Sequence, residues 1–352
     1  MSTIRNIKQS IYDWPTPIVR MLMFANKLMK QEEIDRAIDA FAETPLTSPE
    51  RRSLKKAIIR DLYRHWITPE EYFLFNFASL SEEAKREFVG DMERSVILGR
   101  LYNSSEQAKV FASKAKTFEH FAKFMKRDLI EIASAADRDT FASFVERHDK
   151  YILKPTRGDG GHGIRIETAP SDRQLETVFR DYLNEAPLVL EELIDQDTKM
   201  ATLHPASVNT VRFTTYYDRG ECTAIQPFLK IGQGSAIVDN GALGGILATI
   251  DERSGVVSSC GRTEDGKFYS THPDTNVQIK GFQIPDWNEL LALVAELVQV
   301  LPGQKYVGWD LAYSATKGWL MVEGNSGGAF IGQQMPQPKG IGPIIQKTLG
   351  RL

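Results

Sequence analysis

The 352-residue sequence contains only two cysteines, no long apolar run and no excess of basic residues. Cys222 and Cys260 are too few for a disulfide framework or a structural zinc site, and we expect both to be reduced in the cytoplasm. Lysine and arginine number 43 against 46 acidic residues, so the charge pattern of a nucleic-acid-binding protein is missing. No segment has the about 18 consecutive apolar residues of a membrane-spanning helix, and Met1–Lys8 does not lead into a signal peptide.

Glycine is almost absent from the first 150 residues. Of the 26 glycines in the chain, only Gly90 and Gly99 fall there. A segment that is poor in glycine and rich in Glu, Lys, Arg, Ala and Leu favours helices. Residues 17–29 predict an amphipathic helix that packs on the core, with contact to a membrane surface as the alternative. We therefore expect a mainly helical region over residues 1–110.

Capping sequences indicate where several of these helices begin. Ser48 and Thr68 each precede Pro and Glu, a combination that places a capping hydroxyl before a first helical turn. Ser81 is followed by two glutamates and opens another helix, which the fourfold apolar spacing through Met92 and Val96 predicts to continue. These signals predict about five helices in this region.

After residue 150 the pattern changes to short strands between turns. Turn sequences at 218–221 and 252–255 favour antiparallel hairpins over a parallel wound sheet, and helices are expected at 171–185 and 287–300. The sequence thus predicts an α+β fold. The predicted strands cover residues 151–153, 164–166, 188–190, 211–217, 226–231, 245–250 and 319–323.

A glycine-rich segment lies between the first two predicted strands. Lys154 precedes Gly160, Gly161 and Gly163, and a strand follows them. A Walker loop or a Rossmann loop requires a helix after the glycines, so both are disfavoured. A glycine-rich hairpin can lay backbone N–H groups over a polyphosphate, and Lys154 would add a point charge. The alternative is a flexible hairpin with a solvent-facing lysine.

Three oxygen-bearing side chains lie near the end of the chain. Glu323 and Asn325 stand two residues apart on a predicted strand and share one face. A turn at 314–318 sets Asp310 opposite Glu323 in a hairpin. Two carboxylates and an amide oxygen suit Mg²⁺ held partly by substrate phosphates. The alternative is a group of exposed polar residues at strand ends.

Together these segments resemble the ATP-grasp superfamily, and more closely its sugar-transfer-associated branch. The resemblance starts from Lys154 with its hairpin, continues at Glu191–Ile194 and ends at Asp310 with Glu323 and Asn325. It implies two α+β lobes that clasp ATP after the helical region, the first over 111–190 and the second over 191–352. Further blocks that resemble the branch are Trp66–Phe77, Leu203–Arg212, Val238–Asn240, Gly244–Gly245, Thr271–Pro273 and Gly308–Asp310.

The resemblance also implies roles for single residues. Lys154 is similar to the lysine that reaches the α/β-phosphates, and Lys114 to an earlier lysine, with Lys116 as its alternative. Glu191 and Glu192 are similar to hinge acids, with Glu191 or the neighbouring backbone at the adenine amino group and the Ile194 N–H at a ring nitrogen. By the same resemblance, the phosphate-covering glycines are Gly160, Gly161 and Gly163, and the magnesium ligands are Asp310, Glu323 and Asn325.

Other polar residues are candidates for the reaction itself. Arg212 and Lys230 lie on predicted strands and could stabilise charge on a transferring phosphoryl group. Asn240 could line an acceptor pocket, although a turn explains it equally. Prolines follow His204 and His272, which indicates extended or turn backbone at both histidines. For His204 we expect structural hydrogen bonding, with a place in the catalytic environment near Arg212 as the alternative.

The resemblance implies an ATP- and Mg²⁺-dependent ligase of the cytoplasm. Such an enzyme joins a small-molecule carboxylate to an amine through an acyl phosphate and releases ADP and phosphate. The resemblance to the branch points to glycan, amino-sugar or peptide-type biosynthesis. The main alternative is a kinase that phosphorylates a hydroxyl of a small molecule or sugar with the same site. A nucleotide-sensing scaffold is the third possibility. The helical region could also form a homodimer surface.

Overall fold

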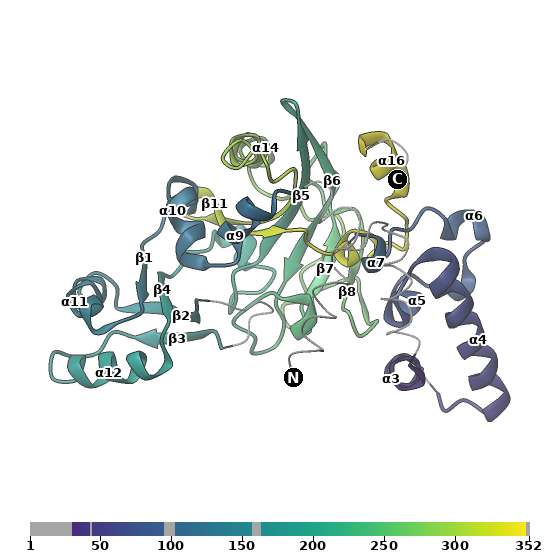
Figure 1. Ribbon diagram of the computed structural model, residues 1–352, viewed down its shortest axis with the longest axis horizontal. Coiled ribbons are helices and arrows are strands. Elements are labelled where there is room, and N and C mark those ends of the chain that lie inside the picture. The colour runs from purple at the N-terminus through teal and green to yellow at the C-terminus, as the bar shows by residue number, and fades with distance from the viewer. Residues whose placement is uncertain (1–29, 43, 95–102, 157–162, 350–352) are drawn as a thin grey trace, which may run out of the picture.

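The computed structural model describes residues 30–42, 44–94, 103–156 and 163–349. Its three parts follow one another along the longest axis (Figure 1). A small lobe built on a four-stranded sheet lies at one end, a large lobe built on a seven-stranded sheet lies in the middle, and a helical region lies at the other end. The helix predicted at 17–29 lies outside the described residues.

The helical region confirms the predicted helical character of the first part of the chain. Thr68 and Ser81 cap helices as expected, whereas the cap of α4 is Thr47 rather than Ser48. Thr47 takes the capping position because Glu50 is then the third helical residue and completes a capping box with it. The elements are α3 (Gln31–Phe41), α4 (Ser48–His65), α5 (Pro69–Leu74), η1 (Phe77–Ser79), α6 (Glu82–Lys85) and α7 (Asp91–Glu93).

The long helix predicted from Ser81 through Met92 is wrong. It stops after one turn at Lys85, and a turn at residues 86–87 leads to an irregular stretch that is extended at Gly90, before the short α7. Gly90 lies against the backbone of α4's last turn, where an added Cβ would be 2.3 Å from the Trp66 carbonyl oxygen. This close approach needs glycine and an extended backbone, so a contact between distant segments overrides the local periodicity. Val96 lies outside the described residues.

The small lobe is a four-stranded antiparallel sheet with helices on its faces. The strand order is β1-β4-β2-β3, and the pairing of β2 with β3 confirms the hairpin around the glycine-rich segment. The predicted helix at 171–185 begins later, at Leu175. Helices α9 (Ser105–Phe111) and α10 (Lys114–Met125) precede this sheet, and their apolar side chains pack on the large lobe. The elements of the small lobe are β1 (Leu129–Ile132), η3 (Ala135–Asp137), α11 (Arg138–Val145), β2 (Lys150–Pro155), β3 (Arg165–Thr168), α12 (Leu175–Glu185) and β4 (Leu188–Glu192).

The large lobe is a seven-stranded antiparallel sheet in the order β11-β10-β5-β6-β7-β8-β9. Its first hairpin turns at Arg219 and Gly220, whose φ angles of 51° and 88° are both left-handed, as a tight two-residue turn requires. The strands are β5 (Thr210–Asp218), β6 (Glu221–Ile231), β7 (Ile246–Thr249), β8 (Gly261–Arg262), β9 (Phe268–Tyr269), β10 (Tyr306–Ser314) and β11 (Gly318–Ser326). The helices are α13 (Thr198–Ala201), η4 (Gly241–Leu243), α14 (Trp287–Leu297), α15 (Ile331–Gln334) and α16 (Gly342–Leu349).

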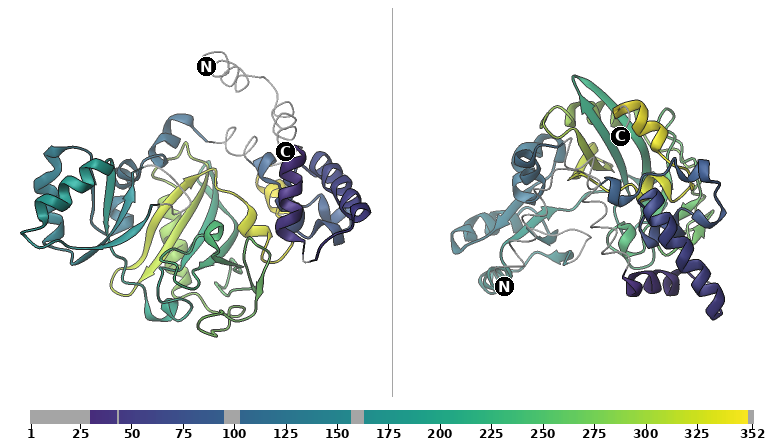
Figure 2. Two further views of the ribbon diagram at one scale, coloured as in Figure 1. Left: turned by 90° about the horizontal axis from the view of Figure 1, so that it is seen from below. Right: turned by 45° about the vertical axis from the view of Figure 1, so that its right-hand side comes forward.

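The helical region packs on the large lobe, on the side away from the small lobe (Figure 2). Apolar residues of α3–α5 share one core with Phe228 of β6, Leu247 of β7 and Met335. Gln334 adds a polar clasp: its Nε2 donates to the Val89 carbonyl oxygen at 2.9 Å, and the Val89 N–H donates to its Oε1 at 3.1 Å. Helical region and large lobe are therefore one packed unit.

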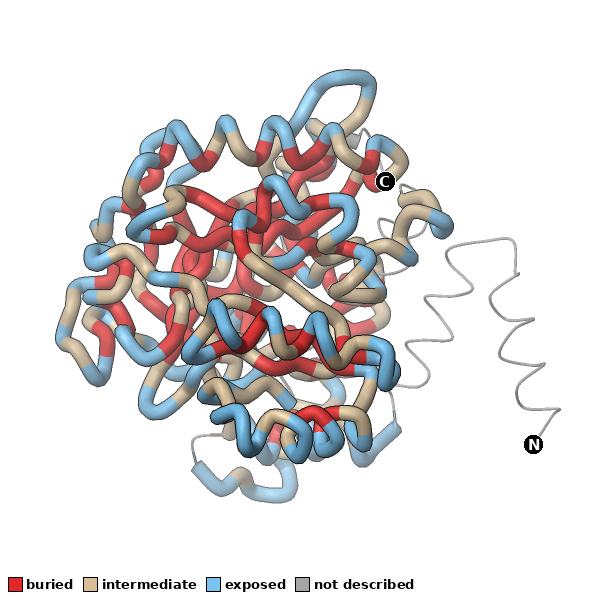
Figure 3. The backbone as a smooth tube through the Cα atoms, turned by 90° about the vertical axis from the view of Figure 1, so that its left-hand side faces the viewer, coloured by how far each residue is buried: buried red, intermediate tan, exposed pale blue. Residues whose placement is uncertain are grey.

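Buried positions line the interior of each lobe, and exposed positions lie mainly on the outward turns of the helices (Figure 3). The small lobe has its own apolar core around Phe141, Tyr151 and Tyr182. The large sheet packs on α10 and α14 through a separate core that includes Trp309 and Trp287. Among the described helices, none has the length and apolar character needed to cross a bilayer.

Replacement of the clasp residue tests how the helical region is attached. Gln334→Ala leaves both polar backbone groups of Val89 buried without these partners, so we expect the free energy of unfolding to fall by about 1–3 kcal/mol. Urea denaturation measures the change. Gln299→Ala removes an exposed amide from another helix end and should change the unfolding free energy far less. Equal stabilities of the two variants would argue against the clasp.

Candidate functional site

A cavity lies between the two lobes and brings together side chains from both sheets. Lys154 and Glu191 face it from the small lobe, Lys114 faces it from the start of α10, and Asp310 and Glu323 face it from the large lobe. The phosphate lysine and the carboxylates predicted from distant segments therefore open onto one space. The remaining lining residues are Arg127, Ile152, Pro155, Ile164, Glu192, Ile194, Val208, Thr210, Lys230, Ile237, Val238, Asp239, Asn240 and Val322.

Asn325 lines an adjoining cavity rather than this one. The two cavities share Lys114, Lys154 and Glu323 in their walls, so they meet at the predicted phosphate and metal residues. Asn325 donates its Nδ2 to Glu323 Oε1 at 3.1 Å. The three residues predicted to bind magnesium are thus neighbours at the junction of the two cavities.

The β10–β11 hairpin sets Asp310 opposite Glu323, which confirms the predicted geometry. Gly308 is the partner of Asn325 in the same ladder. Glu323 is exposed, and Asp310 is buried. Two carboxylates and an amide oxygen form a hard donor set, and their placement across one hairpin fits a Mg²⁺ ion that also takes oxygens from a phosphate.

Two cations hold the Asp310 carboxylate. Arg212 is its register partner on β5 and donates to both of its oxygens, with Nη2 at 2.8 Å from Oδ2. Lys230 Nζ lies 3.2 Å from Asp310 Oδ2 and 3.2 Å from Asp239 Oδ1. Burial alone would raise the pKa of Asp310, but the charges of Arg212 and Lys230 bring it well below its usual range. The carboxylate is therefore ionised.

The small lobe shows the same arrangement around Glu191. Lys154 Nζ lies 2.9 Å from Glu191 Oε2, and Arg127 donates to that oxygen from Nε at 3.2 Å and from Nη2 at 3.0 Å. Burial alone would raise the pKa of Glu191, but the two cations lower it to about 2. Since this carboxylate is engaged by two cations, the geometry favours the neighbouring backbone for the predicted contact with an adenine amino group.

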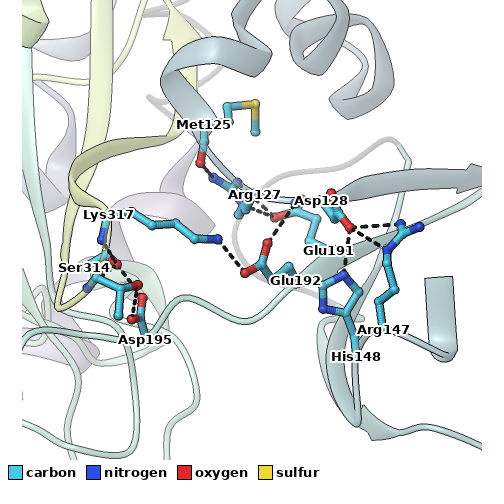
Figure 4. A network of polar contacts seen from close by, with 11 residues as sticks. Met125, Arg127, Asp128, Arg147, His148, Glu191, Glu192, Asp195, Ser314 and Lys317 are labelled. Carbon is cyan, nitrogen blue, oxygen red and sulfur yellow. Dashed lines mark hydrogen bonds and ion pairs between the residues drawn. The ribbon is translucent and has the colours of Figure 1, made fainter.

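Glu192 points away from Glu191 and connects the lobes (Figure 4). Its carboxylate accepts a hydrogen bond from the Asp128 N–H at 3.0 Å. It also forms an ion pair with Lys317, whose side chain extends from the β10–β11 turn. Ile194 lines the cavity, and its N–H has no hydrogen-bond acceptor among the residues that the structure describes. That N–H is available for the predicted contact with a ring nitrogen.

The structure separates the two lysines at the start of α10. Lys114 lines both interlobe cavities, whereas Lys116 lines a different cavity beside Pro187. Lys114 is therefore the one that faces the candidate site. Of the predicted phosphate-covering glycines, Gly163 has a left-handed φ of 72°, while Gly160 and Gly161 lie outside the described residues.

The remaining candidates divide between the cavity and the protein interior. Asn240 lines the cavity, and its Oδ1 also accepts the Ala242 N–H at 3.0 Å, so it makes the expected turn as well. His204 and His272 are buried and hydrogen-bonded, to Ser207 at 2.8 Å and to the Gly232 carbonyl oxygen at 2.7 Å. The hydrogen bonds of His204 agree with the expected structural bonding, and His272 is bonded in a similar way.

Sequence reasoning missed Arg127. It follows Lys126 and precedes Asp128, so the sequence shows only a charged stretch between a helix and a strand. In the structure its side chain is 1% exposed and lines the cavity. No motif marks a buried arginine of this kind, because its closest partners are a side chain on β4 and two carbonyl groups on β11. Its one local contact is a longer hydrogen bond from Nη1 to the Met125 carbonyl oxygen at 3.4 Å.

Glu191→Gln tests the charge balance of the small lobe. The substitution leaves two buried cations without their carboxylate, so we expect a loss of about 3–5 kcal/mol in unfolding free energy at about pH 7. The folded-state pKa is depressed, so this stabilisation is present above the usual value of 4.5 and is lost as pH falls toward about 2. Denaturation at about pH 7, 5 and 3 measures the unfolding free energies of Glu191→Gln and wild type. The difference between the two should become smaller as the pH falls.

The matched control is Glu185→Gln, which breaks an exposed pair with Arg165 and should cost less than about 1 kcal/mol. A pH-independent difference between wild type and Glu191→Gln would contradict the assigned ion pairs.

Comparison with known proteins identifies the family of the chain. Residues 93–349 match the family model described as sugar-transfer associated ATP-grasp. Among curated proteins, none matches the chain. Solved structures with a similar fold include an ATP-grasp ligase, PsnB, complexed with minimal precursor, at 14% identity over 73% of this chain and 68% of that chain, with a TM-score of 0.43.

Two other solved structures show similar levels of likeness. D-alanyl-alanine synthetase A from Vibrio cholerae is 11% identical over 71% of this chain and 63% of that chain, with a TM-score of 0.40. N5-carboxyaminoimidazole synthase from Aspergillus clavatus is 10% identical over 68% of this chain and 51% of that chain, also with a TM-score of 0.40. The chain thus spans between about half and two thirds of these proteins. The family match covers well over half of the present sequence, and the chain belongs to the sugar-transfer associated ATP-grasp family.

Proposed function

We propose that this protein is an ATP-dependent ligase that joins a carboxylate to an amine through an acyl phosphate, with release of ADP and phosphate. The observation that carries the proposal is the shared cavity, in which Lys154 of the small lobe and Lys114 of α10 face Asp310 and Glu323 of the large lobe. Cations on one side and oxygen ligands on the other are the groups that a nucleoside triphosphate with Mg²⁺ requires.

Basic and acidic residues of the cavity have different roles in this proposal. Lys154 and Lys114 meet the negative charge of the phosphates, and the backbone next to Glu191 with the Ile194 N–H binds the base. Asp310, Glu323 and Asn325 would hold Mg²⁺, which neutralises phosphate charge when bound. A free carboxylate has a poor leaving group, so its activation as an acyl phosphate makes attack by an amine possible. Catalysis in such a site is mainly positioning and electrostatic stabilisation.

Arg212 and Lys230 are the cations beside the reacting groups. Both contact Asp310, which places their charges next to the predicted metal ligand. When charge develops on the transferring phosphoryl group, these cations can stabilise it without reorganisation of solvent. Asn240 lines the wall of the cavity next to Ile237 and Val238, where the acceptor would enter. The family's association with sugar transfer suggests a glycan or amino-sugar derivative as one of the two small substrates.

The reaction products distinguish the proposed ligase from a kinase with the same site. A ligase should release ADP and phosphate only when a carboxylate and an amine are both present, and hydroxylamine should trap the acyl phosphate as a hydroxamate. We expect this pattern in a screen of carboxylate and amine pairs monitored by phosphate release. A stable phosphate ester formed without an amine would instead identify a kinase. Nucleotide binding without turnover across the screen would contradict both enzymes.

Glu323→Ala tests the metal assignment. Glu323 is exposed, so its removal should leave the fold intact, but the loss of one carboxylate ligand should reduce ATP turnover by about 100-fold or more. Phosphate release measures turnover, and circular dichroism checks the fold. Glu221→Ala removes an exposed glutamate from the β5–β6 turn of the same sheet and should turn over ATP like wild type. Full turnover by Glu323→Ala would refute the assignment.

A further inference from the structure

We propose that Arg127 is a positioning residue that holds the phosphate lysine of the small lobe and the metal-ligand strand of the large lobe in one geometry. The inference rests on the proposed function, since it takes Lys154 and Glu323 in the roles given there. Arg127 lies between α10 and β1, almost fully buried, and its guanidinium contacts both lobes at the cavity wall.

On the small-lobe side, Arg127 determines where the Lys154 ammonium lies. Both side chains donate to the same oxygen, Glu191 Oε2. The arginine therefore fixes the position of the oxygen to which the lysine ammonium binds. A lysine side chain is long and flexible, and a fixed carboxylate restricts its head group. Two cations share one carboxylate here, so the trio carries one net positive charge beside the cavity, which suits a polyphosphate.

On the large-lobe side, Arg127 binds a β-bulge. The β10–β11 ladder pairs Leu311 with Met321 and Asp310 with Glu323, so Val322 is an extra residue that has no partner in the ladder. Arg127 donates from Nη1 to the Met321 carbonyl oxygen at 2.6 Å and from Nη2 to the Val322 carbonyl oxygen at 2.9 Å.

A bulge changes the direction of the side chains that follow it, and buried carbonyl groups in a bulge need donors from elsewhere. Glu323 is the next residue after Val322. The arginine therefore stabilises the backbone irregularity that aims the metal ligand into the cavity.

Only a guanidinium can make this set of contacts. Its planar group carries five N–H donors in a fixed fork, and here three of its nitrogens serve one carboxylate and two successive carbonyls (Figure 4 shows the carboxylate side). A lysine at this position keeps the charge but reaches one of these partners at a time. A methionine keeps the volume and loses every donor.

The test combines two substitutions with two measurements. Arg127→Met and Arg127→Lys should each weaken the binding of Mg–AMPPNP about tenfold or more in calorimetry, because Lys154 loses its fixed partner. In nucleotide-free protein, both variants should speed hydrogen exchange of the amides in residues 320–324. In Arg127→Ala, added guanidinium should restore part of the nucleotide affinity, which a general loss of stability would not allow.

Arg147→Met is the matched control. Arg147 is an exposed arginine of the same lobe that pairs with Asp128, and its loss should change neither measurement. Wild-type affinity in either Arg127 variant, or unchanged exchange in residues 320–324, would overturn the proposal. If Arg127→Met does not fold, Arg127→Lys carries both measurements.

The outcome also separates this inference from the proposed function. The exchange measurement needs no nucleotide and no substrate, so it reports on Arg127 alone. Failure of wild type to turn over ATP with any carboxylate and amine, together with altered exchange in the variants, would remove the ligase and keep the positioning role. Normal ligase activity in wild type and in both variants would keep the ligase and remove the positioning role.

Discussion

The structure depends on carboxylates that are each shared by two cations between the lobes. Glu191 is held by Lys154 and Arg127, and Asp310 by Arg212 and Lys230. Buried charges are stable only when they are paired and hydrogen-bonded, so each acid fixes the position of two basic side chains. In the small lobe the two cations outnumber the one carboxylate, so positive charge remains beside the cavity. In the large lobe Asp239 also pairs with Lys230 and balances the charge there. The small lobe thus presents preorganised positive charge, where a polyphosphate would otherwise have to order flexible side chains.

Much of this arrangement follows from local sequence chemistry. The turn at Arg219 and Gly220 favours a tight hairpin, and the length of the segment between Asp310 and Glu323 sets the two carboxylates opposite each other. A glycine-rich run between two strands predicts a hairpin rather than a loop before a helix, and β2 with β3 forms one. In each case the determining contacts lie within about twenty residues, which a single sequence can show.

The features that the sequence did not reveal depend on contacts between distant segments. Gly90 interrupts a helical pattern because the backbone of Trp66 passes beside it. β1 has only four residues, one of which is charged, so its sequence shows no clear alternation of apolar and polar residues. Its place in the sheet is set by pairing with β4. The contacts of Arg127 and the bulge at Val322 also depend on distant segments, since they form only when the end of α10, β4 and β11 come together. The residues that tune the site are therefore harder to predict than the residues that would contact a ligand.

The attachment of the helical region has a consequence for how a molecule could enter and leave. Gln334 and a shared apolar core fasten that region to the large sheet, while the small lobe keeps a core of its own. An opening of the cavity that lets a molecule enter would therefore separate the small lobe from the large lobe and its helices, which are one packed unit. Such a movement would have to keep or break the contacts that Arg127 and Lys317 make between the sheets.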